Sequence, residues 1–394
     1  MDRVRFGVIG AGGSMAGLHI RTFDQIDGLA FTAASDVDAD ALAEVVEEHG
    51  VRGFADASAM IGSGEIDAVL IACPHYDHPR FAMEAFDAGV HVLCEKPVAV
   101  TARAAQEVND AYAAARKKHP GLIFAGMFNQ RTNPVWKEIK RLCEHGGVGE
   151  LMRVSWTITT WFRTQTYYDS GGWRATWAGE GGGVLINQCP HNLDLFQWFV
   201  GMPSRVHAHV SLGKYHHIEV EDDVTAVLEF PSGAVGTFVT STGQSPGINR
   251  LEIVGELGTI ISDGASLTHR RAEQPVSEYC RTSKERSGSV PVTDLAITPA
   301  SPSGGGGEHQ RVTANFVETL LAGGTQDDLV APGTEMIYGL ELGNAMLMAG
   351  LTKQPVDLPT DRAAFAALIE ELKAKSTFEK NETVATSKDL AGSH

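Results

Sequence analysis

The sequence predicts a two-domain α/β protein, in which a doubly wound parallel sheet is followed by an α+β domain with a mainly antiparallel sheet. In the first 130 residues, short apolar runs alternate with helical patterns, which is typical of strand–helix–strand units. Later runs alternate apolar and polar residues between turn signals, as antiparallel strands with one buried face do. A chain of 394 residues is also long for a single core. We expect domains over 1–130 and 131–376, and a tail over 377–394.

Composition argues against several classes of partner. Asp and Glu number 49 against 32 Lys and Arg, and the resulting charge of −17 argues against nucleic acid. No apolar run has the length of a membrane span, and the first residues lead into a strand without a signal-peptide pattern. The 5 cysteines are scattered and odd in number, which fits reduced thiols. We expect a cytoplasmic protein that acts on a small molecule.

A glycine-rich turn follows the first expected strand, residues 4–9, and leads into a helix. This order predicts a dinucleotide site of the Rossmann type. Gly10 permits the tight turn, and Gly12 lets the backbone approach a pyrophosphate at the start of the helix. Met15 occupies the place of the motif's third glycine, so we expect a turn one residue longer than usual or a helix set further from the strand. The cofactor contacts expected from this turn are Gly10, Gly12, Gly13, Ser14 and Met15.

The second expected strand, residues 31–35, ends at Asp36. A carboxylate there can accept hydrogen bonds from both ribose hydroxyls and repels a 2′-phosphate. No Arg or Lys follows within ten residues to bind that phosphate, so NAD is expected rather than NADP. Alternatively, Asp36 is a solvated turn residue and Asp38 caps the next helix.

Two further expected strands, residues 67–73 and 90–94, end in polar residues. Open α/β sheets bind ligands at the carboxyl ends of their strands, so both ends should border the cofactor. Pro74, His75 and His78 follow the first of these strands, although loop polarity and helix capping would also explain the histidines.

The second of these strands ends in Glu95-Lys96-Pro97. A lysine at this position can hold its ammonium group against a substrate hydroxyl, and the proline stiffens the bond that follows. Glu95 either supports the lysine or borders the nucleotide. Most of the substrate site should lie after Lys96 in the sequence.

The second domain should contain an antiparallel sheet with a free face. Its expected strands are residues 151–162, 205–212, 223–230, 234–240 and 251–254. A free sheet face suits a homo-oligomer, either a dimer or a tetramer. Helices over about 308–321 and 334–348 should pack on the first domain or on this sheet, and the Ser-, Pro- and Gly-rich residues 283–307 predict a mobile loop.

The second domain also contains a candidate catalytic segment, from Gly181 to Asp194. Asn187 and His191 are four residues apart and share a helix face if the helix includes both. Asp194 could orient His191, and an imidazole is the usual general base for a hydroxyl. The alternative for His191 is a buried, hydrogen-bonded core histidine.

Aromatic residues are concentrated just before this segment. Five lie in its glycine-rich approach: Trp161, Tyr167, Tyr168, Trp173 and Trp177. Aromatic faces suit the C–H faces of a sugar ring, but they also suit a lid or an interface.

Taken together, these motifs resemble the glucose-fructose oxidoreductase / inositol dehydrogenase / MocA family over roughly residues 4–375. The glycine turn, Asp36 and Asp67-Ala68-Val69 contribute, and Glu95-Lys96-Pro97 and the segment from Gly181 to Asp194 are the most specific. The resemblance implies a Rossmann domain joined to a domain with a large open antiparallel sheet. It also implies bound NAD(P) and hydride transfer between an alcohol and a ketone of a sugar, glycoside or cyclitol.

The resemblance implies that Lys96 binds the reacting hydroxyl and that His191 is the acid or base. Residues expected around the cofactor are Gly10, Gly12, Gly13, Ser14, Met15, Asp36, Pro74, His75, His78, Glu95, Lys96, Asn129, Trp173 and Arg174. Residues expected around the substrate are Lys96, Arg131, Tyr168, Trp173, Asn187 and His191.

One departure from the family concerns proton transfer, because many members have an aspartate where this chain has Asn187. An amide cannot take a proton, so Lys96 and His191 must do this work. No metal is expected, because the histidines near 207–217 lack a completing set of cysteines or carboxylates.

Three functions stay open at this stage. The first is an NAD-dependent dehydrogenase. The second is a redox-neutral glycoside-processing enzyme that keeps NAD bound through oxidation, elimination and reduction. The third is a non-catalytic sensor of a sugar or of NAD.

Overall fold

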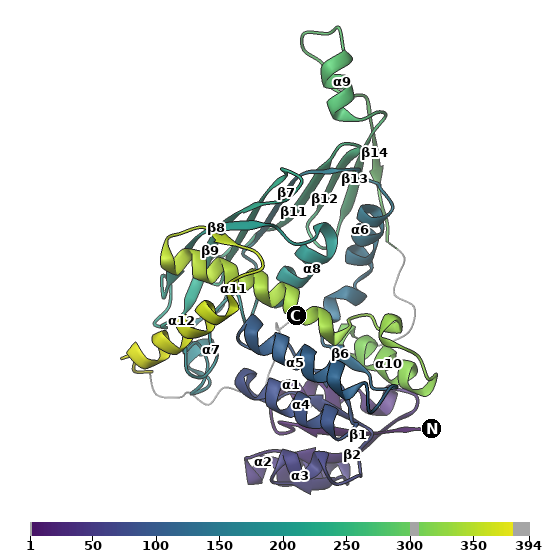
Figure 1. Cartoon of the computed structure of the whole chain (residues 1–394), viewed down its shortest axis with the longest axis vertical. Coiled ribbons are helices and arrows are strands. Elements are labelled where there is room, and N and C mark those ends of the chain that lie inside the picture. The colour runs from purple at the N-terminus through teal and green to yellow at the C-terminus, as the bar shows by residue number, and fades with distance from the viewer. Residues whose placement is uncertain (1, 300–306, 381–394) are drawn as a thin grey trace.

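The computed structural model describes residues 2–299 and 307–380, which form two sheets with helices around them (Figure 1). The first sheet has six parallel strands in the order β3-β2-β1-β4-β5-β6. They are β1 (Val4–Ile9), β2 (Leu29–Ser35), β3 (Arg52–Phe54), β4 (Ala68–Ile71), β5 (His91–Cys94) and β6 (Phe124–Gly126). The strand order reverses between β1 and β4, so the predicted doubly wound sheet is confirmed.

Helices cover both faces of this sheet, because its central strands are apolar on both sides; all of β4, for example, is buried. One face packs against α3 (Ala57–Ile61), α4 (His78–Asp87) and α5 (Ala102–Ala115). The other packs against α1 (Ser14–Ile20), α2 (Ala39–His49) and α10 (Glu308–Leu321). The rings of Phe316 on α10 and Phe6 on β1 lie 6.1 Å apart. The chain thus returns to its first domain near its end.

The second sheet has nine strands in the order β14-β13-β12-β11-β7-β10-β9-β8-β15. They are β7 (Leu151–Ile158), β8 (Arg205–Leu212), β9 (Glu221–Glu229), β10 (Val235–Ser241), β11 (Asn249–Gly255), β12 (Gly258–Ser262), β13 (Leu267–Ala272), β14 (Val292–Ala296) and β15 (Val356–Asp357). Only β7 and β10 pair in parallel among the described strands of this sheet. The predicted mainly antiparallel sheet is therefore confirmed.

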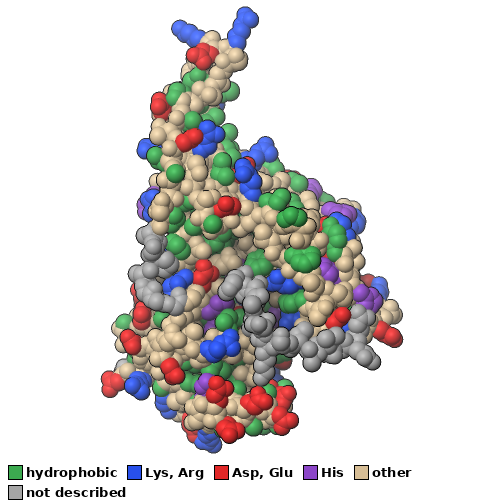
Figure 2. Space-filling view, turned by 180° about the vertical axis from the view of Figure 1, so that it is seen from behind, with side chains coloured by type: hydrophobic (Ala, Val, Ile, Leu, Met, Phe, Trp, Pro, Cys, Tyr) green, Lys and Arg blue, Asp and Glu red, His purple; other side chains and the backbone are tan. Residues whose placement is uncertain are grey.

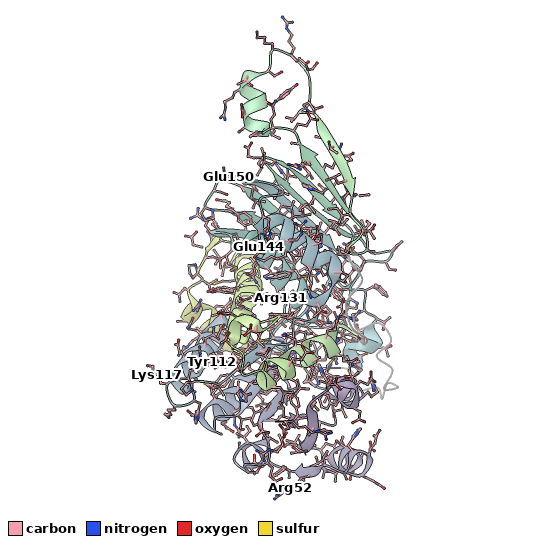
Figure 3. The ribbon with its side chains drawn as sticks, turned by 90° about the vertical axis from the view of Figure 1, so that its right-hand side faces the viewer. Arg52, Tyr112, Lys117, Arg131, Glu144 and Glu150 are labelled. Atoms are coloured by element: carbon pink, nitrogen blue, oxygen red, sulfur yellow. The ribbon has the colours of Figure 1, made fainter. Side chains whose placement is uncertain are left out.

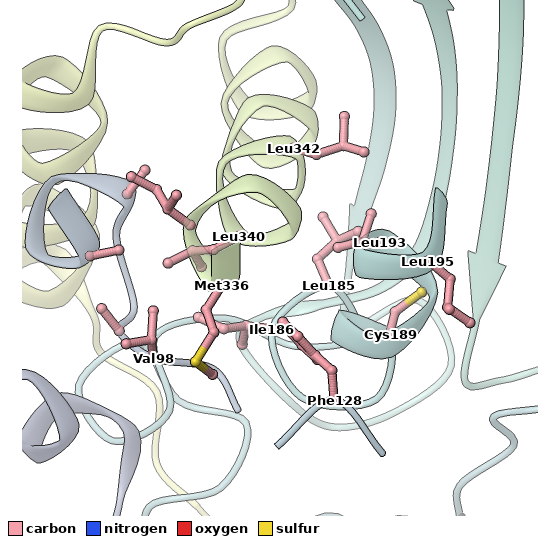
Figure 4. Close-up of a cluster of buried hydrophobic side chains, with 14 of the residues drawn as sticks. Val98, Phe128, Leu185, Ile186, Cys189, Leu193, Leu195, Met336, Leu340 and Leu342 are labelled. Carbon is pink, nitrogen blue, oxygen red and sulfur yellow. The ribbon is translucent and has the colours of Figure 1, made fainter. Parts of the chain in front are cut away.

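Helices cover one face of the second sheet, namely α6 (Pro134–Glu144), α8 (Pro190–Val200) and α11 (Met336–Thr352), and the other face is open (Figure 1). On β9, Val224 is buried under the helices, whereas Val227 is exposed on the open face. Figure 4 shows Met336 of α11 between Val98 of the first domain and Leu193 of α8. The two domains therefore share one hydrophobic core, which holds their facing edges in place.

Some sequence-based boundaries were wrong. The predicted loop over 283–307 contains β14, because hydrogen bonds to β13 give this Ser-, Pro- and Gly-rich stretch a strand partner. Strands β12 and β13, and the short helices α7 (Gln165–Asp169) and α9 (Val276–Thr282), were also not predicted. A further helix, α12 (Arg362–Lys375), follows β15. Residues 300–306 of the predicted loop, and 381–394 of the predicted tail, lie outside the described residues.

Candidate active site

A cleft of about 820 Å³ runs along the carboxyl ends of β1, β2, β4 and β5 and is bordered on its other side by the second domain. The carboxyl ends of parallel strands meet at one edge of a sheet, so turns that are far apart in sequence line the same cleft. Every residue expected at the cofactor lines it. Of the residues expected at the substrate, Lys96, Trp173, Asn187 and His191 line it, whereas Arg131 and Tyr168 do not.

The glycine turn presents bare backbone to the cleft. Gly10 has a φ of +77°, and a Cβ there would lie 2.9 Å from the backbone of Cys73. A Cβ on Gly12 would lie 2.5 Å from Cβ of Ala41. Helix α1 begins directly after the turn, so Met15 lies in its first helical turn. These contacts explain why glycine is required, and the turn fits the close approach of a pyrophosphate.

The end of β2 is tied to this turn. The backbone N–H of Gly12 donates a hydrogen bond to Oδ2 of Asp36 at 2.8 Å. The neighbouring Asp38 caps α2, since its Oδ1 accepts from the N–H groups of Asp40 and Ala41 at 3.0 and 3.1 Å. The two aspartates therefore have different structural roles. Asp38 caps α2, as the sequence suggested, and Asp36 holds the glycine turn at the edge of the cleft. A carboxylate beside bare glycine backbone fits a dinucleotide with an unmodified ribose.

His78 connects the loops that follow β4 and β5. Its Nε2 lies 2.7 Å from the carbonyl oxygen of Cys73, and its Nδ1 lies 2.7 Å from that of Pro97. The ring of His75 packs edge-on against Trp173 of the second domain at 5.7 Å. Both histidines line the cleft, and their contacts hold its walls together.

Glu95 and Lys96 extend from β5 at the centre of the cleft. Burial alone would raise the pKa of Glu95, but His19, whose Nε2 lies 2.7 Å from Oε1, together with the charges of His309 and Lys96 lowers it to about 2. Nζ of Lys96 donates to the backbone carbonyl of Asn187 at 2.8 Å. Burial lowers the pKa of Lys96, and the charges of Glu95 and Glu180 partly oppose this effect. The lysine therefore spans from the first domain to the second.

His191 lies in the first turn of α8, which begins at Pro190, and it borders the cleft. Its Nδ1 is buried without a hydrogen-bond partner among the described residues. Burial, followed by the positive charge of Lys96, holds the pKa of His191 well below its usual value. The imidazole is therefore neutral at pH 7, which is the form that can accept a proton.

Asp194 does not orient His191, which corrects the expectation from sequence. Its two carboxylate oxygens accept from Nε and Nη2 of Arg131 at 2.8 and 2.7 Å. Asn187 also lies before α8 rather than on a helix face with His191. The spacing suggested one helical face, but the helix begins only at Pro190.

Arg131 lies between the domains rather than in the cleft (Figure 3). Its side chain is 1% exposed and also pairs with Glu335 at 2.6 Å. The guanidinium carbon lies 5.2 Å from the ring of Trp198. Arg131 lies in η3 (Asn129–Thr132), and its ion pairs connect this segment to Asp194 of α8 and to Glu335 at the start of α11.

Tyr167, one of the five aromatic residues that the sequence singled out but not one of those expected around the substrate, lines the cleft in place of Tyr168. Tyr168 is buried, and its hydroxyl donates to Oγ1 of Thr242 at 2.8 Å. Successive residues on a helix point about 100° apart, so only one of the pair can face the cleft. The hydroxyl oxygen of Tyr167 accepts from Arg174 at 2.7 Å, Gln188 at 3.2 Å and Asn187 at 3.3 Å.

Glu180 is a further residue at the cleft that was not predicted from the sequence. It is fully buried behind the cleft wall, and its carboxylate accepts from the backbone N–H of Ala175 at 2.6 Å and from Nδ2 of Asn187. Burial raises its pKa, and the nearby Arg174 is the main opposing influence. An acidic residue beside three glycines looks solvent-exposed in sequence, and only the packing of the chain around it reveals its place.

No group of three or more His, Cys, Asp or Glu residues in the part of the chain that the structure describes is placed to hold a metal ion. His216 instead contacts Asp222 at 3.0 Å, and His207 contacts Glu229 at 2.7 Å. None of the described helices has the length and hydropathy needed to cross a membrane.

Known proteins match both halves of the chain. Residues 4–122 match the oxidoreductase family with an NAD-binding Rossmann fold, and residues 136–261 match the GFO/IDH/MocA C-terminal domain. Inositol 2-dehydrogenase 2 of Saccharopolyspora erythraea is 30% identical over 274 residues, covering 68% of this chain and 76% of that protein. Levoglucosan dehydrogenase of Pseudarthrobacter phenanthrenivorans is 25% identical over 91% of this chain and 99% of its own length.

A solved structure shows the same similarity along nearly the whole chain. The WlbA dehydrogenase of Chromobacterium violaceum, in complex with NADH and UDP-GlcNAcA, superposes with a TM-score of 0.75 and 26% identity. The superposition covers 92% of this chain and 97% of that one. With both domains matched and a cleft that fits a dinucleotide, the chain belongs to the GFO/IDH/MocA family of oxidoreductases with an NAD-binding Rossmann domain.

Proposed function

We propose that this protein is an NAD-dependent dehydrogenase or reductase that acts on a secondary alcohol, or its ketone, of a sugar or polyol. The observation that carries the proposal is the joint presence of Lys96, His191 and the glycine turn with Asp36 in one cleft. The family and its sugar and cyclitol dehydrogenases support the substrate class. The aromatic side chains of Trp161, Tyr167 and Trp173 in the cleft suit a sugar ring.

Bound NAD supplies the hydride acceptor, and the protein orients the substrate and handles its proton. Lys96 binds the oxygen of the reacting hydroxyl with its ammonium group and stabilises the negative charge that develops there. His191, which is neutral because its pKa is lowered, accepts the hydroxyl proton through its ring. In the reverse direction the protonated His191 returns the proton to the alkoxide as the carbonyl is reduced.

The proposal is tested by following NADH formation with a panel of sugars, cyclitols and glycosides. Lys96→Ala is expected to lower kcat/KM by about a hundredfold or more while NAD still binds, since removing one group that stabilises a developing oxyanion costs about that much. Lys117→Ala, at an exposed lysine after α5, is the matched control and should turn over normally. Near-normal turnover by Lys96→Ala would contradict the role assigned to the lysine.

The same assay separates the other candidate functions. Consumption of a glycoside without net NADH release, by protein that retains NAD through purification, would identify redox-neutral processing instead. Tight NAD binding without turnover of any substrate would favour a sensor.

We also propose that the protein is a cytoplasmic homo-oligomer, a dimer or tetramer, that associates through the open face of the second sheet. Apolar side chains on exposed positions of this sheet support this contact, including Met152, Val227 and Val235. Sedimentation of the wild type and of Val227→Lys tests this contact, which the variant should weaken. A wild-type mass equal to that of one chain would contradict the proposal.

A further inference from the structure

Two arginines border the part of the cleft that contains the proposed catalytic residues. Arg163 and Arg174 both line it, and their guanidinium carbons lie 5.0 and 4.5 Å from the ring centre of Tyr167. Each also packs over a tryptophan, at 5.9 Å for Arg163 and Trp161 and 4.7 Å for Arg174 and Trp173. Aromatic rings on both sides restrict these guanidinium groups to the cleft wall.

Neither guanidinium has a carboxylate partner within 4.0 Å among residues 2–299 and 307–380. The side chain of Arg163 donates one hydrogen bond, to the backbone carbonyl of Phe162 at 3.0 Å. Arg174 donates to the Tyr167 hydroxyl, and its Nε is buried without a hydrogen-bond partner among the described residues. By contrast, Arg80, which also lines the cleft, pairs with Glu84 at 2.9 Å.

Arg174 is close enough to Glu180 for its charge to oppose the raised pKa of that carboxylate, but no ion pair or hydrogen bond joins the two side chains. Glu180 accepts hydrogen bonds from Ala175 and Asn187, and Glu95 faces His19. Acidic side chains are plentiful on the outside of the first domain, as the lower part of Figure 2 shows, and the chain has a net charge of −17. The absence of an ion pair to either arginine among the described residues therefore does not reflect a shortage of acids.

Unpaired cations at this site carry a cost. Burial is the main cause of the lowered pKa of Lys96, and the charges of Arg174 and Arg163 lower it further. Partly buried guanidinium groups without a direct ion-pair partner are also unfavourable in themselves. Such an arrangement is expected where an anion arrives with a ligand, because guanidinium groups bind carboxylate or phosphate through two parallel hydrogen bonds.

We propose that Arg163 and Arg174 form an oxyanion subsite, so that the substrate is a sugar or cyclitol that carries a carboxylate or phosphate group. This inference rests on the proposed function and specifies its substrate class. The glycine turn offers a separate place for the cofactor pyrophosphate, next to Asp36. Arg163 therefore serves the substrate, while Arg174 borders both ligands.

The test is calorimetric binding to NAD-saturated protein, which needs no turnover. Matched pairs of ligands separate the sources of the anion: D-glucuronate and D-glucose, D-galacturonate and D-galactose, D-glucose 6-phosphate and D-glucose, and myo-inositol 1-phosphate and myo-inositol. At least one acid or phosphate should bind roughly tenfold tighter than its neutral parent, and this preference should shrink with added salt. The better-binding class identifies a carboxylate or a phosphate.

Arg163→Met is expected to abolish the roughly tenfold preference for the anionic ligand over its neutral parent. The affinities for NAD and for the neutral parents should stay within about twofold of those of the wild type. Arg116→Met is the matched control, because Arg116 also packs on a ring, Tyr112 at 5.9 Å, but lies outside the cleft lining. Arg174→Met should weaken binding of both the anion and NAD.

Three outcomes would overturn the subsite. These are neutral sugars binding as tightly as their acids and phosphates, no anionic probe binding at all, or Arg163→Met weakening NAD and leaving anion preference intact. Each is distinguishable from failure of the proposed function, in which NAD does not bind or no alcohol is oxidised even when Arg163 is unaltered.

Discussion

The carboxylate of Glu180 accepts a hydrogen bond from the side-chain amide of Asn187. A carboxylate can only accept, so this contact determines which end of the amide faces it. The same Nδ2 also points to the hydroxyl of Tyr167. Asn187 lines the cleft, so we expect its Oδ1 to be the acceptor for a substrate hydroxyl. We therefore expect Glu180 to act as a positioning residue through Asn187.

Glu180→Gln should lower kcat/KM roughly tenfold, because glutamine can donate as well as accept and no longer orients the amide. Steady-state kinetics measure this effect. Adding Asn187→Asp to the variant should restore activity, since the aspartate can accept a hydrogen bond from the introduced glutamine amide. A double variant no more active than Glu180→Gln alone would argue against the positioning role.

The charge of Lys96 should be detectable in the titration of His191. Burial is the main cause of the lowered pKa of His191, and Lys96 is the second. Lys96→Met should therefore raise this pKa, while leaving it below the usual value. Histidine side-chain NMR over a pH series measures the change, with Lys117→Met as the control. An unshifted His191 resonance would mean that the two side chains are not coupled.

The preference for NAD should depend on the charge of Asp36. Asp36→Asn keeps an oxygen that can accept from the N–H of Gly12 but removes the charge that repels a 2′-phosphate. Affinity for NADP should rise about tenfold, and affinity for NAD should fall by less. Tryptophan fluorescence titrations measure both. Asp40→Asn, an equal charge change in the first turn of α2 but outside the cleft lining, should leave the ratio unchanged.

Arg131 should matter for stability rather than for substrate affinity. Arg131→Met leaves the carboxylate of Asp194 buried without its partner, which should cost about 3–5 kcal/mol of unfolding free energy. Urea denaturation measures the loss, and the KM of the folded enzyme should not change. Arg131→Met combined with Asp194→Leu should recover part of the stability. A raised KM with unchanged stability would instead indicate that Arg131 contributes to the substrate site.

Glu221 should make stability depend on pH. It is fully buried, and burial raises its pKa from 4.5 to about 7. Between these two values the folded protein holds a proton that the unfolded chain has released, so stability falls as pH rises through this window. The Glu221→Gln variant should not lose stability in this window, because glutamine does not titrate. Relative to wild type, it should gain about 1–3 kcal/mol of unfolding free energy between about pH 5 and pH 8.

Thermal and urea unfolding at several pH values test this prediction. Glu47→Gln, at an exposed position of α2, is the control for the loss of one carboxylate. A constant difference between wild type and Glu221→Gln across the series would show that Glu221 does not titrate in this window.

The parts of the site that follow strands were predictable, because strand ends are local features. Gly10, Asp36 and Lys96 each lie within two residues of the end of a strand, and a parallel sheet brings such positions to one edge. The spacing of residues 187–194 was less informative. It placed Asn187 and Asp194 beside His191, whereas α8 begins later than the pattern suggests and Asp194 turns to Arg131.

Local pattern was thus sufficient for the two-sheet architecture, the glycine-rich turn and the choice of Lys96 and His191 as candidates. Alternation of apolar residues and turn chemistry act over a few residues, so a sequence records them directly. Tertiary structure alone decided that Tyr167 rather than Tyr168 faces the cleft, that Arg131 is buried in an ion pair, and that Glu180 lies behind Asn187. These contacts depend on how the second domain packs against the edge of the first sheet, and no short-range pattern encodes the distance or direction of a side chain from a distant segment.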